Sequence, residues 1–356
     1  MSYTLPAGLS ETVKQILNDW QVTDKVRRLW AQDASLWTNS DESKWLGWLT
    51  IVSEQIDNIE TLKAFADEIK EAGFAHALLL GMGGSSLCPE VLKMTFGHIE
   101  KFPELHVLDS TDPAQVIATE NKIDLAGTLF IVASKSGTTL EPNIFNQYFF
   151  DRAKQVVGET EVGNRFIAIT DPGSKMQQVA ERDKFRRIFF GLPNIGGRYS
   201  ALSNFGLVPA AVMGLDLDHF LNSTKLMVSA CGAETQAAEN PGVVLGAILG
   251  AAANQGRDKL TIIASQQIFD LGAWLEQLIA ESTGKEGKAI IPVDREAISS
   301  PDEYGDDRVF VCLKLEGEAD EAQESALAAL EQAGHPIIRI TLKDTYDLGQ
   351  EFFRWE

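Results

Sequence analysis

The chain has 356 residues, of which 44% are apolar and 23% are charged, a balance ordinary for a soluble globular protein of one or two domains. A net charge of −20 argues against a nucleic-acid partner, which needs clustered Lys and Arg, but a local pocket can still hold a small anion. Cys88, Cys231 and Cys312 are too far apart for a disulfide framework, and we see no signal peptide or membrane span, so we expect a cytoplasmic protein without a membrane partner.

Residues 1–72 are predicted to form an N-terminal helical segment. Ser10 is a candidate cap, and Val13, Ile16 and Leu17 follow it at helical spacing. Residues 61–72 form a second amphipathic pattern. Five of the seven tryptophans fall within this segment, and we interpret them as packing residues.

Residues 73–215 form the first predicted domain, in which short apolar strands alternate with helices. The expected strands are 77–80, 105–108, 129–133, 166–170 and 187–190, and the expected helices are 89–96, 113–121, 141–157 and 174–182. This alternation favours a parallel sheet with helices on both faces. The strands are nearly continuous apolar runs, as expected for strands that are buried on both sides.

Residues 216–356 form the second predicted domain and repeat the rhythm without a convincing sequence repeat. The expected helices are 217–229, 243–255, 267–281 and 318–333, and the expected strands are 260–264, 289–293, 308–314 and 336–341. The predicted fold class is therefore α/β, with two domains that each contain a mostly parallel sheet flanked by helices. The final stretch, 348–356, begins a helix with an aromatic face and has no C-cap signal, which suggests that the C-terminal helix is incomplete and the chain truncated.

The first motif that carries chemistry is GMGGSS at residues 81–86, between a predicted strand and a predicted helix. A glycine-rich turn before a helix N-terminus is a typical anion site. The pattern also approaches the dinucleotide fingerprint, with Asp109 after the next strand, so an NAD-dependent oxidoreductase is an alternative. The last position is Ser86 rather than glycine, and serine hydroxyls suit a phosphate monoester better.

The second motif is SKSGTT at residues 134–139, again after a buried strand and before a helix. It carries four hydroxyl groups, and Lys135 either adds a cation or points to solvent. Two such turns at the carboxyl ends of nearby strands would meet at a topological switch point. The pair predicts a site for a small phosphorylated substrate.

Two further residues could handle a proton and the charge that its transfer creates. Arg198 lies in the segment GGRYS, where flexible glycines present a guanidinium that can stabilise a developing oxyanion. Glu281 lies at the C-terminal end of a predicted helix. The helix dipole disfavours a negative charge there, so the carboxylate accepts a proton more readily, which suits a general base. Either residue alone could equally be an ordinary surface residue.

Taken in order, these motifs resemble the signature stretches of the glucose-6-phosphate isomerase family. The segments ESTGKEGK at 281–288 and YGDDR at 304–308 look most like the isomerase part of bacterial bifunctional transaldolase/glucose-6-phosphate isomerases. The resemblance implies two sugar-isomerase (SIS) domains, interconversion of glucose 6-phosphate and fructose 6-phosphate through a cis-enediolate, no metal or other cofactor, a homodimer, and a fused or adjacent transaldolase.

The resemblance also assigns the site residues. The phosphate-binding residues that it implies are Gly84, Ser85, Ser134, Lys135, Ser136, Thr138 and Thr139. Arg198 matches the arginine beside the enediolate, and Glu281 matches the base that moves a proton between C2 and C1.

The chain departs from the family pattern in its ring-opening residues. The family's histidine is absent from 292–308, and the later His335 reads as a turn residue between a helix and a strand. The family's lysine on a C-terminal helix would lie beyond Glu356. A non-catalytic module that binds sugar phosphates is therefore a further alternative.

Overall fold

The structure is a computed structural model and describes residues 1–318 and 320–356. The chain divides into two compact units, and we describe each by itself. The middle unit is Lys44–Leu221, and the terminal unit joins Met1–Ser43 to Asn222–Glu356. The expected N-terminal segment is thus shared between the two units, and the expected break near residue 215 lies at residue 221 instead.

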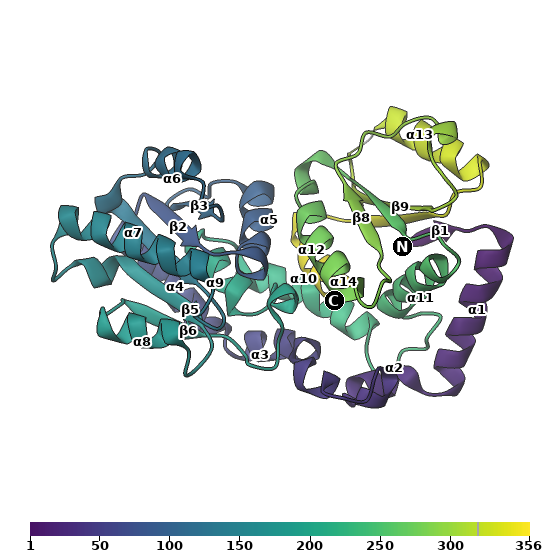
Figure 1. The fold of residues 1–356 in the computed structure, drawn as a ribbon, viewed down its shortest axis with the longest axis horizontal. Helices are drawn as coiled ribbons and strands as arrows, with labels where there is room; N and C mark the ends of the chain where they lie inside the picture. Colours follow the sequence, from purple (N-terminus) through teal and green to yellow (C-terminus); the bar gives the residue numbers. More distant parts are fainter. Residues whose placement is uncertain (319) are drawn as a thin grey trace. The chain divides into compact units, whose positions relative to one another are not determined.

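The middle unit contains a sheet of five parallel strands in the order β3-β2-β4-β5-β6 (Figure 1). Its strands are β2 (His76–Leu80), β3 (Glu104–Leu108), β4 (Thr128–Ala133), β5 (Phe166–Thr170) and β6 (Arg187–Phe190). Its helices are α3 (Ile51–Asp57), α4 (Ile59–Ala72), α5 (Leu87–Phe96), α6 (Pro113–Glu120), α7 (Leu140–Val157), α8 (Lys175–Arg182) and α9 (Asn204–Val212). All five strands expected from the apolar runs are present.

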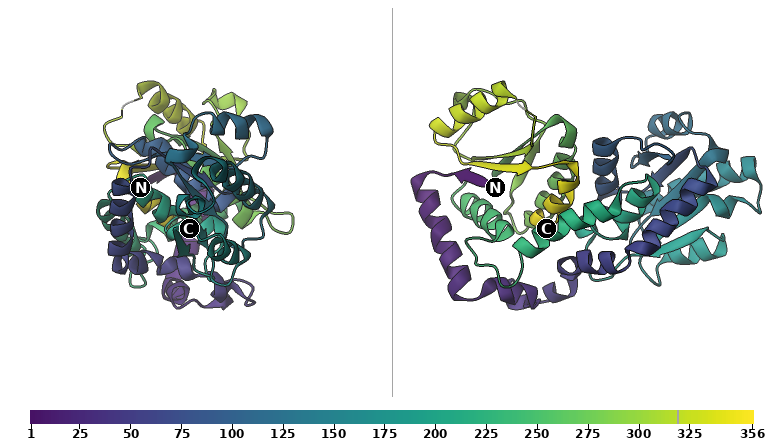
Figure 2. Two further views of the ribbon diagram at one scale, coloured as in Figure 1. Left: turned by 90° about the vertical axis from the view of Figure 1, so that its left-hand side faces the viewer. Right: turned by 180° about the vertical axis from the view of Figure 1, so that it is seen from behind.

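The helices cover both faces of this sheet because its strands are apolar on both faces. On one face, Phe130 and Phe166 stack at 4.6 Å between ring centroids, under Phe149 of α7. On the other face, α4 packs against α9, and Phe65 of α4 meets Phe189 of β6 at 4.8 Å. The views from front and back show α7 and α4 on opposite sides of the sheet (Figure 2).

The terminal unit contains a second five-stranded sheet, in the order β1-β10-β9-β7-β8. Its strands are β1 (Ser2–Thr4), β7 (Lys259–Ala264), β8 (Ile291–Asp294), β9 (Arg308–Leu315) and β10 (Ile337–Leu342). Its helices are α1 (Ala7–Val22), α2 (Lys25–Trp30), α11 (Pro241–Asn254), α12 (Leu271–Thr283), α13 (Glu321–Gln332) and α14 (Leu348–Trp355), and α10 (Leu217–Ala230) carries the chain from the middle unit into this one. The edge strand β1 pairs antiparallel with β10 and was not predicted.

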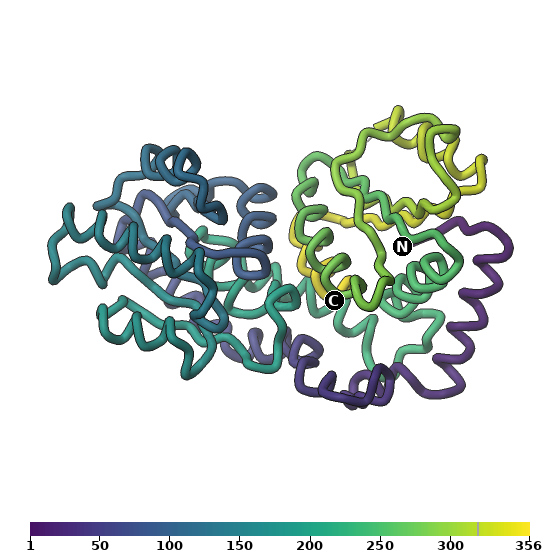
Figure 3. The backbone as a smooth tube through the Cα atoms, in the orientation of Figure 1, coloured from purple at the N-terminus to yellow at the C-terminus, as the bar shows by residue number. Residues whose placement is uncertain are grey.

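The two sheets have the same winding, which can be followed along the backbone (Figure 3). In each sheet the chain leaves a central strand, forms the neighbour on one side, and then crosses to the other side. The central pairs are β2 with β4 and β7 with β9. The expected fold class, α/β with two mostly parallel sheets flanked by helices, is confirmed. None of the helices within residues 1–318 and 320–356 has both the length and the apolarity needed to cross a bilayer.

Candidate functional site

The two hydroxyl-bearing loops follow β2 and β4, which are hydrogen-bonded neighbours in the middle unit. The sheet order reverses between these two strands, so this is the topological switch point that the motifs predicted. Both loops lead into a helix, α5 after the first and α7 after the second. The fold therefore brings residues 81–86 and 134–139 to one edge of one sheet.

The backbone of the first loop lies so close to the loop that carries Arg198 that position 84 has no room for a side chain. A Cβ atom on Gly84 would lie 2.1 Å from the carbonyl oxygen of Gly197 and 2.8 Å from the amide nitrogen of Arg198. The hydroxyl of Ser200 donates to the carbonyl oxygens of Gly84, at 3.2 Å, and Gly197, at 2.6 Å. Gly84 was expected to bind phosphate; in the structure it packs the first loop against the loop that carries Arg198. The neighbouring Ser85 lies at the end of a short 3-10 turn and is half-buried.

The innermost residue of the second loop carries a buried hydroxyl group. Ser134 is only 2% exposed, and its Oγ has no hydrogen-bond partner among the described residues. Its backbone is held in place, because its N–H donates to the carbonyl of Ile169 at 3.0 Å. A buried hydroxyl without a partner is costly and therefore needs an explanation. An anion bound at the switch point would provide the missing acceptor.

The outer hydroxyls of the second loop are exposed and preorganised. The hydroxyl groups of Ser136 and Thr138 lie 2.6 Å apart, and the N–H of Thr138 donates to Ser136 Oγ at 3.2 Å. Thr139 is the residue before α7, where N–H groups at the helix start face the loop. Gly137 has φ +65°, and a Cβ there would lie 2.3 Å from the backbone nitrogen of Met176. The loop is therefore held against the start of α8.

Lys135 has a role that the sequence did not indicate. Its ammonium group forms an ion pair with Asp171, and it also donates to the carbonyl of Leu192 at 3.0 Å. Asp171 follows β5, the next strand along the same edge of the sheet, and its backbone N–H donates to the carbonyl of Lys135 at 3.0 Å. The charge of Lys135 is thus balanced by a carboxylate, and the lysine neither points freely to solvent nor provides an unopposed cation. Asp171 directly follows the predicted strand 166–170, and this place at the end of a third strand was the signal in the sequence that could have identified it as a site residue.

Arg198 lies in a short 3-10 turn, Gly197–Tyr199, and is half-buried. Its guanidinium stands over the ring of Tyr199, 5.2 Å from the centroid. Tyr199 in turn stacks on Trp48, with 5.9 Å between the ring centroids. The backbone around Leu46 bridges to Ile195, which fixes the start of this loop. Tyr199 belongs to the motif, but Trp48, which stacks on it, lies far away in the sequence and could not be identified from the motif.

Glu281 lies in the terminal unit, in the last turn of α12, and is exposed. The side chain of Lys285 donates to the backbone carbonyl of Glu281 at 2.7 Å, which caps the helix end. His335 lies between α13 and β10, as predicted for a turn residue, and packs on Phe310 at 5.5 Å between ring centroids. Burial lowers the pKa of His335, and the charge of Arg257 adds to that effect.

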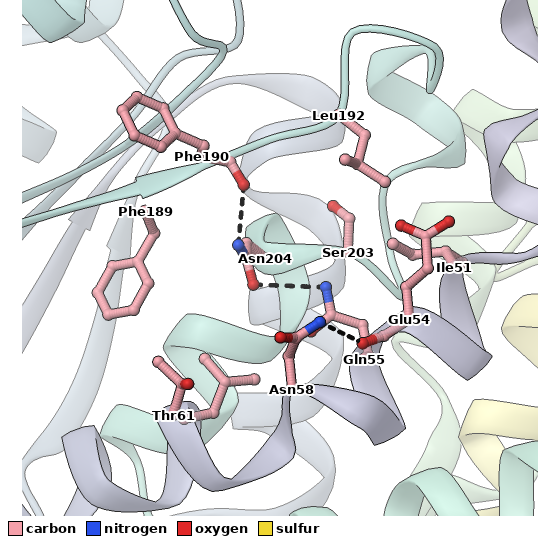
Figure 4. A pocket seen from close by; sticks show the side chains of 11 residues that line it. Ile51, Glu54, Gln55, Asn58, Thr61, Phe189, Phe190, Leu192, Ser203 and Asn204 are labelled. Atoms are coloured by element: carbon pink, nitrogen blue, oxygen red, sulfur yellow. Dashed lines mark hydrogen bonds between the residues drawn. The ribbon is translucent and has the colours of Figure 1, made fainter.

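A separate pocket of about 300 Å³ opens in the middle unit between α3, α4, β6 and α9 (Figure 4). None of the predicted site residues lines it. Its amide groups are bonded to one another: Gln55 donates to Asn204 at 3.4 Å, and Asn204 donates to the carbonyl of Phe190 at 2.8 Å. Asn58 also donates to the carbonyl of Glu54, and the carboxylate of Glu54, which lines the pocket, opposes the binding of an anion there.

Both the family that this chain matches and curated relatives of the chain are glucose-6-phosphate (phosphoglucose) isomerases. The chain matches a family described as phosphoglucose isomerase over residues 51–300, a range that includes all the predicted site residues. Glucose-6-phosphate isomerase of Rubrobacter xylanophilus is 30% identical over 295 residues, covering 79% of this chain and 64% of that protein. The chain therefore spans less than two thirds of that relative's length.

Two solved structures share the fold. A hypothetical protein from Thermus thermophilus has a TM-score of 0.83 at 21% identity, with 99% of this chain and 92% of that chain covered. A glucose-6-phosphate isomerase from Chlamydia trachomatis has a TM-score of 0.71 at 20% identity, with 94% of this chain and 72% of that chain covered. At these identities the likeness shows a common fold.

Proposed function

Because the chain belongs to the phosphoglucose isomerase family, we propose that the protein is an aldose–ketose isomerase that interconverts glucose 6-phosphate and fructose 6-phosphate. The observation that supports this most directly is the pair of hydroxyl loops at one switch point, with the buried hydroxyl of Ser134 lacking a partner among the described residues. A terminal phosphate supplies several acceptor oxygens, which match a cluster of hydroxyl and N–H donors.

In this proposal the middle unit holds the phosphate group. The residues that donate to it are Ser85, Ser134, Ser136, Thr138 and Thr139, together with N–H groups at the loop glycines. Lys135 orients the second loop through its pair with Asp171, and its positive charge still lies close to the bound anion. Holding the substrate by its non-reacting end allows binding energy to position the reacting carbons.

Glu281 and Arg198 carry the chemistry. Glu281 takes the proton from C2 of the open-chain aldose, and the electrons of that C–H bond form the C1–C2 double bond of a cis-enediolate. The negative charge that develops on oxygen is stabilised by the Arg198 guanidinium. Returning the proton to C1, with transfer of the hydroxyl proton from the C2 oxygen to the C1 oxygen and formation of the C2=O double bond, gives the ketose.

The experiment compares two carboxylates on the same helix. Glu281→Gln removes the base and keeps its shape, so kcat in a coupled isomerase assay should fall by about 10²–10⁴-fold while fructose 6-phosphate still binds. Glu276→Gln, at an exposed position of α12, is the matched control and should keep wild-type activity. Full activity of Glu281→Gln would reject the assigned base. Binding without turnover in the wild type would instead favour a non-catalytic sugar-phosphate module.

The oxidoreductase alternative is not proposed. In the position of the third glycine of a dinucleotide loop, Ser86 is fully buried and its hydroxyl donates to the carbonyl of Gly83 at 3.1 Å. A homodimer, a fused or adjacent transaldolase and a cytoplasmic location stay predictions.

A further inference from the structure

Three metal-ligating side chains lie together at the start of β2 and β3 in the middle unit. β2 begins at His76 and β3 begins at Glu104, and the register pairs these two residues directly. His106 is two residues further along β3 and therefore projects from the same face as Glu104. The hydroxyl loops follow the other ends of the parallel strands, so this cluster and the candidate phosphate site occupy opposite edges of one sheet.

The distances within the cluster are those of a nearly formed metal site. His76 Nδ1 and His106 Nε2 lie 3.2 Å apart, and His106 Nε2 lies 3.9 Å from a carboxylate oxygen of Glu104. All three ligand atoms lie within 4.8 Å of one another. Tetrahedral zinc has bonds of about 2.0–2.1 Å to nitrogen, which places neighbouring ligand atoms about 3.3–3.4 Å apart. The two imidazoles thus need almost no movement, and the exposed Glu104 side chain needs only a small rotation.

The chemistry of the donors fits the same cation. Two imidazole nitrogens and a carboxylate are a ligand set that zinc takes in proteins, with a water in the fourth position. Two lysines, Lys93 and Lys122, place positive charge near His106, and Glu104 places negative charge there. A neutral ring can offer Nε2 by keeping its proton on the other nitrogen. Of the two lysines, Lys93 is paired with Glu90 at 3.4 Å, which reduces its repulsion of a cation.

We propose that His76, His106 and Glu104 form a Zn²⁺-binding site at the amino ends of β2 and β3. Such a site would tie the starts of two adjacent strands together and would stabilise the middle unit without taking part in chemistry at the carboxyl ends. Its alternative is a simple hydrogen bond between two imidazoles, for which the same 3.2 Å separation is also adequate.

The test is a calorimetric titration of the metal-stripped full chain with ZnCl₂. We expect one strong site per chain and a Zn²⁺-dependent rise in melting temperature, because a ligand that binds only the folded state stabilises it. His76→Ala and His106→Ala should each raise the Kd at least tenfold and remove the thermal shift. Glu104→Gln, an exposed and nearly isosteric change, is the variant least at risk of misfolding and should weaken binding in the same direction.

The matched control is His98→Ala. His98 is exposed on the same unit, and its Nε2 lies 2.8 Å from the carbonyl oxygen of Phe102, outside the cluster. This variant should bind Zn²⁺ as the wild type does, and isomerase activity should be unchanged in all four variants. Absence of a strong site in the wild type would leave only the imidazole hydrogen bond. Wild-type Zn²⁺ affinity in both His76→Ala and Glu104→Gln would place the metal elsewhere. Either result overturns the proposal.

Discussion

The two sheets have the same winding but different chemistry at their switch points. In the middle unit the loops after β2 and β4 carry glycines and hydroxyls, with Ser134 Oγ buried and unpartnered among the described residues. In the terminal unit the corresponding loops follow β7 and β9. There Ser265 Oγ accepts a hydrogen bond from the N–H of Leu315 at 3.0 Å, and the exposed Glu316 follows.

This difference shows that the winding alone does not create an anion site. In both sheets the carboxyl ends of the central strands lie at a topological switch point, the place where α/β folds commonly bind ligands. The middle unit has a buried hydroxyl, Ser134 Oγ, without a partner among the described residues, whereas Ser265 of the terminal unit accepts a backbone hydrogen bond and the carboxylate of Glu316 follows at the end of β9. Function therefore follows from the loop residues that the common fold displays.

The largest expected effect tests the close approach of the loops in the middle unit. In Gly84→Ala the new methyl group would overlap the carbonyl of Gly197, so the loop that carries Arg198 must move. We expect kcat/KM to fall by about a hundredfold or more, since misplacement by about 1 Å can cost that much, and the melting temperature to drop. Gly197→Ala is the control, because a Cβ there has nothing within 4 Å. Equal losses in both variants would show that the close packing is not the cause.

The next prediction concerns a buried carboxyl group in the terminal unit, that of Glu351. Burial raises the pKa of Glu351 to about 7, although Arg354 at 3.2 Å opposes the shift. The folded state therefore retains a proton that the unfolded chain releases near its ordinary pKa of 4.5. This stabilisation is complete below that pH and is lost as the pH rises to about 7, a change on the order of 3 kcal/mol.

The measurement is urea unfolding between pH 5 and 8 at constant ionic strength. Glu351→Gln should flatten the decline whatever its absolute stability, because the titrating group is gone. Glu316→Gln, at an exposed position of the same unit, should keep the wild-type slope. A wild-type slope in Glu351→Gln would assign the titration to another group.

A smaller effect isolates the buried hydroxyl of the middle unit. Ser134→Ala should weaken fructose 6-phosphate binding by about ten- to a hundredfold, the usual value of a hydrogen bond to a charged group. The stability of the free protein should not fall, because Ser134 Oγ has no partner to lose among the described residues and its burial is itself costly. Ser203→Ala is expected to do the opposite, since it removes the cap bond to the N–H of Phe205 and costs about 1 kcal/mol. Unchanged affinity in Ser134→Ala would remove this hydroxyl from the phosphate site.

The smallest effect comes from the corresponding serine of the terminal unit. Ser265→Ala removes the bond from the N–H of Leu315 and should cost about 1 kcal/mol in unfolding free energy. Isomerase activity and sugar-phosphate affinity should stay at wild-type values. A loss of affinity comparable to that of Ser134→Ala would mean that both switch points bind the substrate, and the contrast between the units would not hold.

The sequence by itself determined the elements and the loop chemistry. Apolar runs such as 77–80 and 129–133 predicted strands that are buried on both faces, and the helices between them predicted parallel pairing. The glycines and hydroxyls of 81–86 and 134–139 predicted anion loops at strand ends, and the structure brings them to one edge. These features depend on local periodicity and on general rules of connection, which a single sequence contains.

The tertiary structure alone decided which distant residues meet. It pairs Lys135 with Asp171, packs Gly84 on Gly197, and joins the first 43 residues to the C-terminal half through β1 and β10. It also gathers His76, Glu104 and His106, which no motif connects. Such contacts arise from the register and close packing of segments far apart in the chain. Local propensity carries no information about them, because each partner looks ordinary in its own sequence context.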